Sequence, residues 1–176
     1  TKPNSFSSLI TPNLRPIQIE MTARSEASYY VLGSDGLIYA LGNNDNGVLG
    51  DNTTTDRSTW VNVQVSGGAN LTDVEFISGN SYSTSYAGAA AIVKDPSTDL
   101  SELYMWGDNE SEMLSSGLSD PQTFAAKPSY YTGVSAGAFA DVNGDATVND
   151  LDRQPIRVAI GGHQSIYYDF LQVNYG

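Results

Sequence analysis

The chain contains two stretches that match each other 65 positions apart, and this repeat constrains the fold more than any other feature. Four positions carry the match, and they pair as Tyr39 with Tyr104, Gly42 with Gly107, Asn44 with Asn109, and Leu49 with Leu114. Aromatic, glycine and asparagine residues that recur at a fixed spacing indicate an architecture built from repeated units. Repeats identify a scaffold better than they identify a chemical activity, so the function needs a separate argument.

Short β-prone runs separated by turn-forming residues follow one another along most of the chain. Ser34-Asp35-Gly36 lies between the runs Ser28–Leu32 and Leu37–Leu41, and Asp-Gly between two such runs favours a β-hairpin because both residues tolerate a positive φ. The further predicted strands are Trp60–Val65, Val74–Ser78, Ala89–Val93, Leu103–Trp106 and Arg157–Tyr168. Amphipathic helices longer than about two turns are not expected. The sequence therefore predicts an all-β fold, with short antiparallel sheets and long loops.

The first 17 residues differ from the rest of the chain. They contain three of its seven prolines, at Pro3, Pro12 and Pro16, and little hydrophobic periodicity. We therefore expect residues 1–17 to form an extended N-terminal arm or linker. Residues 18–176 are expected to form the repeat domain, with an acidic insertion at 141–152.

The two repeated units resemble a known family. The first unit, residues 29–51, reads Tyr-Tyr-Val-Leu-Gly-Ser-Asp-Gly-Leu-Ile-Tyr-Ala-Leu-Gly-Asn-Asn-Asp-Asn-Gly-Val-Leu-Gly-Asp. It resembles the repeat of the regulator of chromosome condensation family, in which a strand, Asp-Gly and a second strand precede Trp-Gly-x-Asn-x-x-Gly-Gln-Leu-Gly. Leu41 stands where the family has Trp, and the second unit has that Trp as Trp106. With Ile160-Gly161-Gly162-His163, which resembles the opening strand of a further repeat, the resemblance covers about two and a half repeats.

The resemblance implies a β-propeller, in which each repeat forms one blade around a central axis. Two and a half blades are too few to close a propeller, so we expect a partial or open array with exposed sheet edges. Three arrangements remain open: the chain is part of a larger propeller, it is an open relative, or identical subunits complete one another. The family's best-known member promotes nucleotide exchange on a small GTPase, and the acidic charge of this chain lends that activity no support.

Acidic residues greatly outnumber basic ones. The 20 Asp and Glu face 8 Lys and Arg, for a net charge of -12, which repels phosphate backbones, so no nucleic-acid partner is expected. Few Lys and much Ser, Thr, Asn, Gly and Tyr are typical of bacterial and phage surface proteins, which predicts an extracellular, cell-surface or virion-surface location. The chain has no cysteine, which excludes thiolate zinc sites and cysteine catalysis. No run of 18 apolar residues occurs, so no membrane span is expected.

Residues 141–152 have the alternating oxygen-bearing side chains of a calcium loop. Five side chains and the backbone carbonyl of Thr147 would surround the ion, and the predicted ligands are Asp141, Asn143, Asp145, Thr147, Asn149 and Asp152. The loop resembles that of dockerins, although Ala146 stands where glycine is usual and Pro155 disfavours the exit helix. The sequence thus predicts calcium as a cofactor, and a solvated acidic turn is the alternative.

Few residues are candidates for catalysis. His163 is the single histidine, and Ser165 is near it in the sequence, but no nucleophile-elbow motif accompanies the pair. Asp108, Glu110 and Glu112 follow Trp106 and would serve as paired carboxylates in a carbohydrate hydrolase. We favour a buried structural role for His163 and a solvated loop for the three acids. No catalytic residues are therefore expected, and the chain is predicted not to be an enzyme.

The 11 tyrosines complete the functional prediction. Exposed Tyr favours protein or glycan binding, whereas Tyr within a strand is simply a good β-former, and the sequence leaves both interpretations open. We predict an extracellular, non-enzymatic structural or adhesive module that binds protein or carbohydrate. The alternative is a self-assembling subunit of a surface filament or virus particle, a homo-oligomer in which neighbouring copies complete the sheets.

Overall fold

The structure is a computed structural model, and it describes residues 13–23, 26–80, 87–97, 101–110, 114, 117–128, 157–160, 165–168 and 173–175. Within these residues, three antiparallel sheets make up the fold. Blade 1 consists of four strands in sequence order, β1 (Pro16–Ala23), β2 (Ala27–Gly33), β3 (Ile38–Gly42) and β4 (Arg57–Asn62). Blade 2 repeats that order with β5 (Val74–Gly79), β6 (Gly88–Lys94), β7 (Ser101–Gly107) and β8 (Gln122–Ala126). The third sheet contains β9 (Arg157–Ile160), β10 (Ser165–Tyr168) and β11 (Val173–Tyr175).

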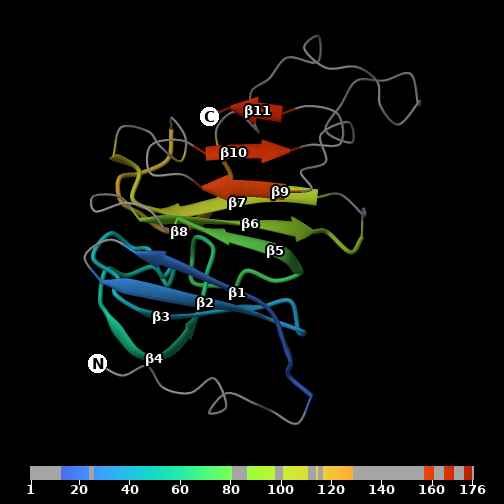
Figure 1. The fold of residues 1–176 in the computed structure, drawn as a ribbon, viewed down its shortest axis with the longest axis horizontal. Coiled ribbons are helices and arrows are strands. Elements are labelled where there is room, and N and C mark those ends of the chain that lie inside the picture. Colours follow the sequence, from blue (N-terminus) through green and yellow to red (C-terminus); the bar gives the residue numbers. More distant parts are fainter. Residues whose placement is uncertain are drawn as a thin grey trace.

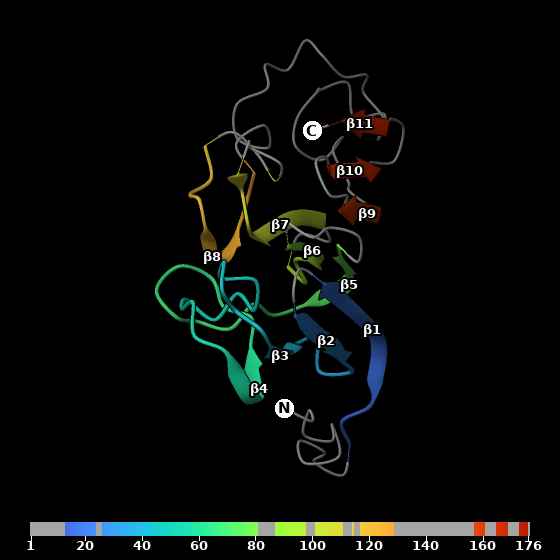
Figure 2. The same cartoon turned by 60° about the vertical axis from the view of Figure 1, so that its left-hand side comes forward.

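The three sheets are stacked along the molecule, with blade 2 between blade 1 and the third sheet (Figures 1 and 2). We call the face of blade 1 that lies toward blade 2, and the face of blade 2 that lies toward the third sheet, the front face. For the third sheet, the front face is the one that points away from blade 2. The opposite face of each sheet is its back face. The front face of blade 1 includes the apolar residues Tyr30, Leu32, Ile38 and Ala40. It packs against the back face of blade 2, which includes Ile77, Ala89, Ala91 and Trp106.

A second apolar layer joins blade 2 to the third sheet. The front face of blade 2 consists of Ala90, Ile92, Leu103 and Met105, and these residues pack with Val158 and Ile160 of β9. Full burial of each large apolar side chain contributes about 1.5–3 kcal/mol. Blade 2 is therefore held by apolar packing on both of its faces.

β6 shows this double burial most clearly. Residues 88–93 are all buried, because Ala89, Ala91 and Val93 face blade 1 while Ala90 and Ile92 face the third sheet. Alternation of apolar and polar residues is typical of a strand with one wet face, whereas a near-continuous apolar run is typical of a strand covered on both faces. The run Gly-Ala-Ala-Ala-Ile-Val therefore fits the central position of β6 (Figure 1).

The predicted hairpin is confirmed. β2 and β3 pair with Val31 opposite Tyr39, and Gly36 in the connecting turn has a φ of 74°. Asp35 closes the turn by accepting hydrogen bonds from the backbone N–H of Leu37 at 3.2 Å and from the hydroxyl of Tyr39 at 2.7 Å. Burial, the hydrogen bond to Asp35 and the Asp35 charge together raise the pKa of Tyr39 to about 12.

Other strand predictions need correction. The run predicted at Trp60–Val65 forms a strand earlier, as β4, because its pairing with β3 begins at Arg57 and ends at Asn62. Arg157–Tyr168 is not one strand but two, β9 and β10, which pair antiparallel with Ile160 opposite Ser165. β1, β8 and β11 were not among the predicted strands. β1 begins at Pro16, so the last two residues of the expected 1–17 arm belong to blade 1, and residues 1–12 lie outside the described part.

The all-β expectation is confirmed, and the described strands form short antiparallel sheets in an open stack. Within the described residues, no helix has the length and apolar character needed to cross a lipid bilayer.

Candidate functional site

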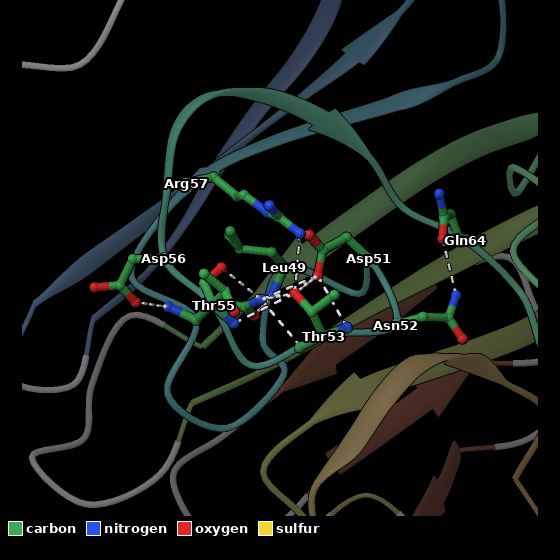
Figure 3. Close-up of polar contacts among 9 residues, drawn as sticks. Leu49, Asp51, Asn52, Thr53, Thr55, Asp56, Arg57 and Gln64 are labelled. Carbon is green, nitrogen blue, oxygen red and sulfur yellow. Dashed lines mark hydrogen bonds and ion pairs between the residues drawn. The ribbon is translucent and has the colours of Figure 1, made fainter.

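The loop between β3 and β4 is organised around the side chain of Asn44, which is completely buried. Its Oδ1 accepts a hydrogen bond from the backbone N–H of Leu49 at 2.8 Å, while its amide nitrogen donates to Asp51 Oδ1 and to the Thr53 carbonyl, both at 3.0 Å. The backbone N–H of Asn44 donates to Asp56 Oδ1 at 2.8 Å. One asparagine thus connects both halves of the loop, a use of the Asn side chain that is common in turns. Figure 3 labels its partners Leu49, Thr53 and Asp56.

Asp51 is the charged centre of the same network. Its Oδ1 accepts hydrogen bonds from the N–H and the hydroxyl of Thr53 at 3.1 and 2.7 Å, and its Oδ2 accepts from Arg57 Nε at 2.6 Å. Burial alone would raise the pKa of this carboxyl. The hydrogen bonds from Thr53 and Arg57, the positive charge of Arg57 and the amide of Asn44 outweigh it and hold the pKa below its ordinary value. Asp51 is therefore an ionised carboxylate that is fully engaged within the fold (Figure 3).

The loop between β7 and β8 uses the same design. Asn109 Oδ1 accepts from the backbone N–H of Leu114 at 2.9 Å, its amide donates to the Leu118 carbonyl at 3.2 Å, and its own N–H donates to Asp120 Oδ1 at 3.1 Å. Leu49 and Leu114, which follow the two asparagines at equal spacing, are both fully buried. The sequence repeat is therefore also a repeat of hydrogen bonding.

Glycine is required where each loop leaves its strand. Gly42 and Gly107 have φ values of 121° and 108°, and a Cβ atom on Gly107 would lie 2.6 Å from the Ala87 carbonyl oxygen. L-residues rarely adopt such φ values, and the neighbouring backbone cannot move aside cheaply.

The two loops also bond to each other across the blade interface. Asn46 Nδ2 donates to Asp108 Oδ2 at 2.7 Å, and Trp106 Nε1 donates to the Val48 carbonyl at 2.9 Å. The hydroxyl of Tyr30 donates to that same carbonyl, and the rings of Tyr30 and Trp106 meet edge to face with centroids 6.2 Å apart. Burial raises the pKa of the Tyr30 hydroxyl, so this group stays protonated and donates.

Backbone pairing extends the joint toward β8. The N–H of Asn52 donates to the Thr123 carbonyl at 2.9 Å, and the N–H of Ala125 donates to the Gln64 carbonyl at 2.8 Å. Phe124 forms an isolated antiparallel bridge with Asp51. The two loops and β8 therefore form one continuous polar edge, with Asp45, Asn52, Thr54 and Glu110 exposed.

The solvated loop expected for Asp108, Glu110 and Glu112 needs correction at Asp108. Asp108 is buried and accepts from the backbone N–H of Glu110 at 2.9 Å as well as from Asn46, while Glu110 is exposed. Glu112 lies outside the described residues. Asp108 thus holds the loop through its hydrogen bonds. Of Asp108 and Glu110, only Glu110 presents its carboxylate to solvent.

Several other predicted site residues lie outside the described part of the chain. They are His163 and the predicted calcium ligands Asp141, Asn143, Asp145, Thr147, Asn149 and Asp152. Among the described residues, no group of three His, Cys, Asp or Glu side chains is placed to hold a metal ion. Of the tyrosines whose side chains are described, Tyr30 is buried, and Tyr29, Tyr39 and Tyr104 are half-buried, as is typical of strand residues rather than an exposed binding surface.

Sequence reasoning missed Asp51, Thr53 and Arg57, although a signal for the wider network was present. Asp56 and Asp120 follow the two paired asparagines at nearly the same distance, and each caps the backbone N–H of its asparagine. At the repeat spacing of 65 positions, Asp51 and Arg57 correspond to Ser116 and Gln122, so a search for repeats passes over the Asp51–Arg57 ion pair.

Comparison with known proteins bears on the fold. Neither a protein-family model nor a curated protein matches the sequence. Among solved structures, the crystal structure of human WBSCR16 is similar, with a TM-score of 0.59 and 14% sequence identity. The similarity covers 89% of this chain and 31% of that one, so the chain spans about a third of the length of that relative. At this identity the likeness shows the fold alone: the chain is an all-β, open, propeller-like array of short antiparallel sheets.

Proposed function

We propose that the chain is a non-enzymatic, extracellular structural or adhesive module, related to the regulator of chromosome condensation family, that binds protein or carbohydrate through its loop edge. One observation carries the proposal. The buried polar side chains of the repeated loops, Asn44, Asp51, Asp108 and Asn109, are all bonded within the fold. Such bonds hold the loops rigidly, and rigid loops at one edge of a blade array are a common way to present a binding surface.

The exposed residues of that edge are mostly acidic or amide-bearing, as Asp45, Asn52 and Glu110 illustrate. Carboxylate and amide groups form hydrogen bonds with sugar hydroxyls and with cationic side chains. The ligand class that fits is therefore a neutral glycan or a basic protein surface, rather than a phosphate-bearing polymer.

A glycan array and a panel of surface proteins, probed with the full chain, test this function. The double change Asp45→Lys and Glu110→Lys should abolish any binding, while Ser66→Lys on the exposed β4–β5 loop serves as the matched control. Binding that survives the double change would move the ligand site away from this edge. Hydrolysis of chromogenic glycosides that is lost in Glu110→Gln would contradict the non-enzymatic proposal.

A calcium ion remains part of the proposal, carried by the oxygen spacing at residues 141–152. If bound there, it would neutralise part of the net charge of -12. Its expected role is structural.

A second candidate function is self-assembly into a surface filament or particle. The observation that favours it is the exposure of apolar side chains on one face of β1.

A further inference from the structure

The loop between β3 and β4 contains an Asn-Gly pair, Asn46-Gly47, at the place where the loop meets blade 2. Asn46 is half-buried, and its Nδ2 donates to Asp108 Oδ2 at 2.7 Å. Gly47 has a φ of 66°, and a Cβ atom on it would lie 2.7 Å from the Cα atom of Thr123 in β8. The joint between the blades therefore uses both the amide of Asn46 and the missing side chain of Gly47.

An Asn-Gly pair is also where a side-chain amide is lost most readily. The backbone nitrogen that follows an asparagine can attack the side-chain Cγ, and glycine offers no Cβ atom to hinder the attack. At the repeat spacing of 65 positions, the loop between β7 and β8 has Ser111-Glu112 in place of this pair. Of the two repeated loops, only the one that reaches from blade 1 to blade 2 contains an Asn-Gly pair.

The closed joint keeps both reacting groups in hydrogen bonds. The N–H of Gly47 donates to the Asn44 carbonyl at 3.0 Å, and the amide of Asn46 is bonded to Asp108. Gly47 is buried, with Thr123 against it. The attack requires the Gly47 nitrogen to leave its acceptor and the Asn46 side chain to turn away from Asp108, so the reaction proceeds from opened forms of the joint.

The product of the reaction does not fit the closed joint. Asp108 is 2% exposed, and it accepts hydrogen bonds from Asn46 Nδ2 and from the N–H of Glu110. Among the described residues, no cationic side chain pairs with Asp108. A carboxylate in place of the Asn46 amide has no hydrogen to donate and carries the same charge as Asp108, so the two groups repel each other across the joint.

We propose that Asn46 is a site of spontaneous deamidation, and that its conversion loosens the joint between blades 1 and 2. The Gly47 nitrogen forms a bond to Cγ of Asn46, the bond from Cγ to Nδ2 breaks, and Nδ2 leaves as ammonia with the proton from Gly47. Water then opens the cyclic imide at one of its two carbonyls, and the ammonia takes up the proton of the new carboxylic acid. Opening at Cγ restores an ordinary peptide bond, whereas opening at the other carbonyl routes the backbone through the side chain as isoaspartate. This chemistry is independent of any ligand of the chain.

Peptide mapping by mass spectrometry measures the reaction in the full chain. In mildly alkaline buffer Asn46 should be converted to aspartate and isoaspartate, at a rate at least about tenfold lower in the folded chain than in concentrated urea. Asn143-Gly144, the other Asn-Gly pair of the sequence, gives a reference rate in urea. An Asn46 that keeps its amide throughout in the folded chain, or that reacts equally fast folded and unfolded, would overturn the proposal.

Asp108→Ala removes the acceptor that holds the Asn46 amide, so it should raise the rate of conversion at Asn46 several-fold. Glu110→Ala removes the same charge from an exposed position of the same loop, and this matched control should leave the rate unchanged. Circular dichroism verifies that both variants are folded. A rate in Asp108→Ala equal to that of the control would mean that the joint does not protect Asn46, and the proposal would be wrong.

An exchange of the two side chains tests the effect of the product without any deamidation. Asn46→Asp should lower the thermal midpoint more than Asn46→Ala, which removes the hydrogen bond and adds no charge. The double variant Asn46→Asp with Asp108→Asn should recover most of the loss, because an amide at position 108 can accept from the N–H of Glu110 and donate to the carboxylate at position 46. If Asn46→Asp keeps the midpoint of the natural chain, or if the double variant is no more stable than Asn46→Asp, repulsion across the joint is ruled out and the proposal fails.

Discussion

The side chain of Gln18 pairs with the backbone of Ile77 as a neighbouring strand would. Gln18 Oε1 accepts from the Ile77 N–H at 3.0 Å, and Gln18 Nε2 donates to the Ile77 carbonyl at 2.7 Å. Among the described strands, β5 is the edge strand of blade 2 and pairs with β6. One glutamine from blade 1 therefore satisfies the outward-facing backbone groups of Ile77, and the joint between the blades is specific as well as apolar.

Gln18→Met should destabilise the chain by about 1–3 kcal/mol, because two partly buried backbone groups of Ile77 lose their partners while the volume of the side chain is kept. Urea denaturation, monitored by Trp fluorescence, measures the loss. Asn70→Ala, at an exposed position in the loop between the blades, is the control and should stay within about 0.5 kcal/mol. A Gln18→Met loss no larger than that of the control would mean that water replaces the side chain.

Asn44→Ala should cost about 2–3 kcal/mol, because the buried N–H of Leu49 loses its acceptor and Asp51 loses one of its donors. Asn109→Ala should also destabilise the chain, by about 1–3 kcal/mol, because the buried N–H of Leu114 loses its acceptor and the Leu118 carbonyl loses a donor. Equilibrium unfolding in urea gives both values. A loss below about 0.5 kcal/mol at either position would contradict the role of that asparagine in holding its loop.

Acid should weaken the chain partly through Asp51. Its folded-state pKa lies below the ordinary value of 3.8, so the unfolded state binds more protons and the stability that Asp51 contributes rises with pH. That contribution is complete at pH values well above 3.8 and disappears as the pH falls through the lower folded-state pKa. Thermal midpoints measured from pH 6 down to about 2 should therefore fall more steeply for the natural chain than for Asp51→Asn. Parallel curves for the two proteins would remove Asp51 from the acid response.

Two glycines with a positive φ allow the cost of backbone strain to be measured apart from the cost of a steric clash. Gly67 has a φ of 88° and open space around the place of a Cβ atom, whereas Gly107 has a φ of 108° and the Ala87 carbonyl oxygen at 2.6 Å from that place. Gly67→Ala should cost about 1 kcal/mol, the cost of the φ value alone. Gly107→Ala should cost several times as much, because β7 and the residue before β6 must also move apart. Equal losses in a chemical denaturation experiment would contradict the steric argument.

Calcium should raise the thermal midpoint of the full chain if residues 141–152 bind it, since a ligand that binds the folded state alone stabilises that state. Asp141→Asn and Asp145→Asn should each abolish the rise in calcium and leave the midpoint in chelator unchanged. Asp99→Asn, an acidic residue outside the predicted loop, is the matched control. Identical midpoints of the natural chain in calcium and in chelator would remove the calcium proposal.

The elements that could be predicted are those whose signal lies in the local sequence. The hairpin around Asp35 and Gly36 and the apolar run of β6 follow from turn chemistry and side-chain pattern. β8 was missed because Gln122-Thr123-Phe124-Ala125-Ala126 follows a proline and carries a weak apolar signal. Its strand form comes from pairing with β7 and from backbone bonds to the first loop, contacts between residues far apart in the chain.

β1 was missed for a different reason. Ile17, Ile19 and Met21 alternate with Gln18 and Glu20, which is a strand pattern, but the apolar residues face solvent and the polar ones face blade 2. The sequence of β1 alone does not explain why its apolar side chains face solvent and its polar side chains face blade 2. The Asn44 loop lies between these extremes: the repeat indicated Asn44 and Leu49, while Asp51 and Arg57 become partners only through the path of the folded loop.

The burial of β6 on both faces also has a consequence for the order in which the chain opens. Blade 1 and the third sheet each pack on blade 2, so either can detach while blade 2 keeps its other neighbour. β6 can lose its protection only after one of its flanking layers has separated. Amide hydrogen exchange should therefore be slowest in β6 and faster in β1 and β11, which makes the centre of the stack the last part to unfold and its two ends the places where unfolding begins.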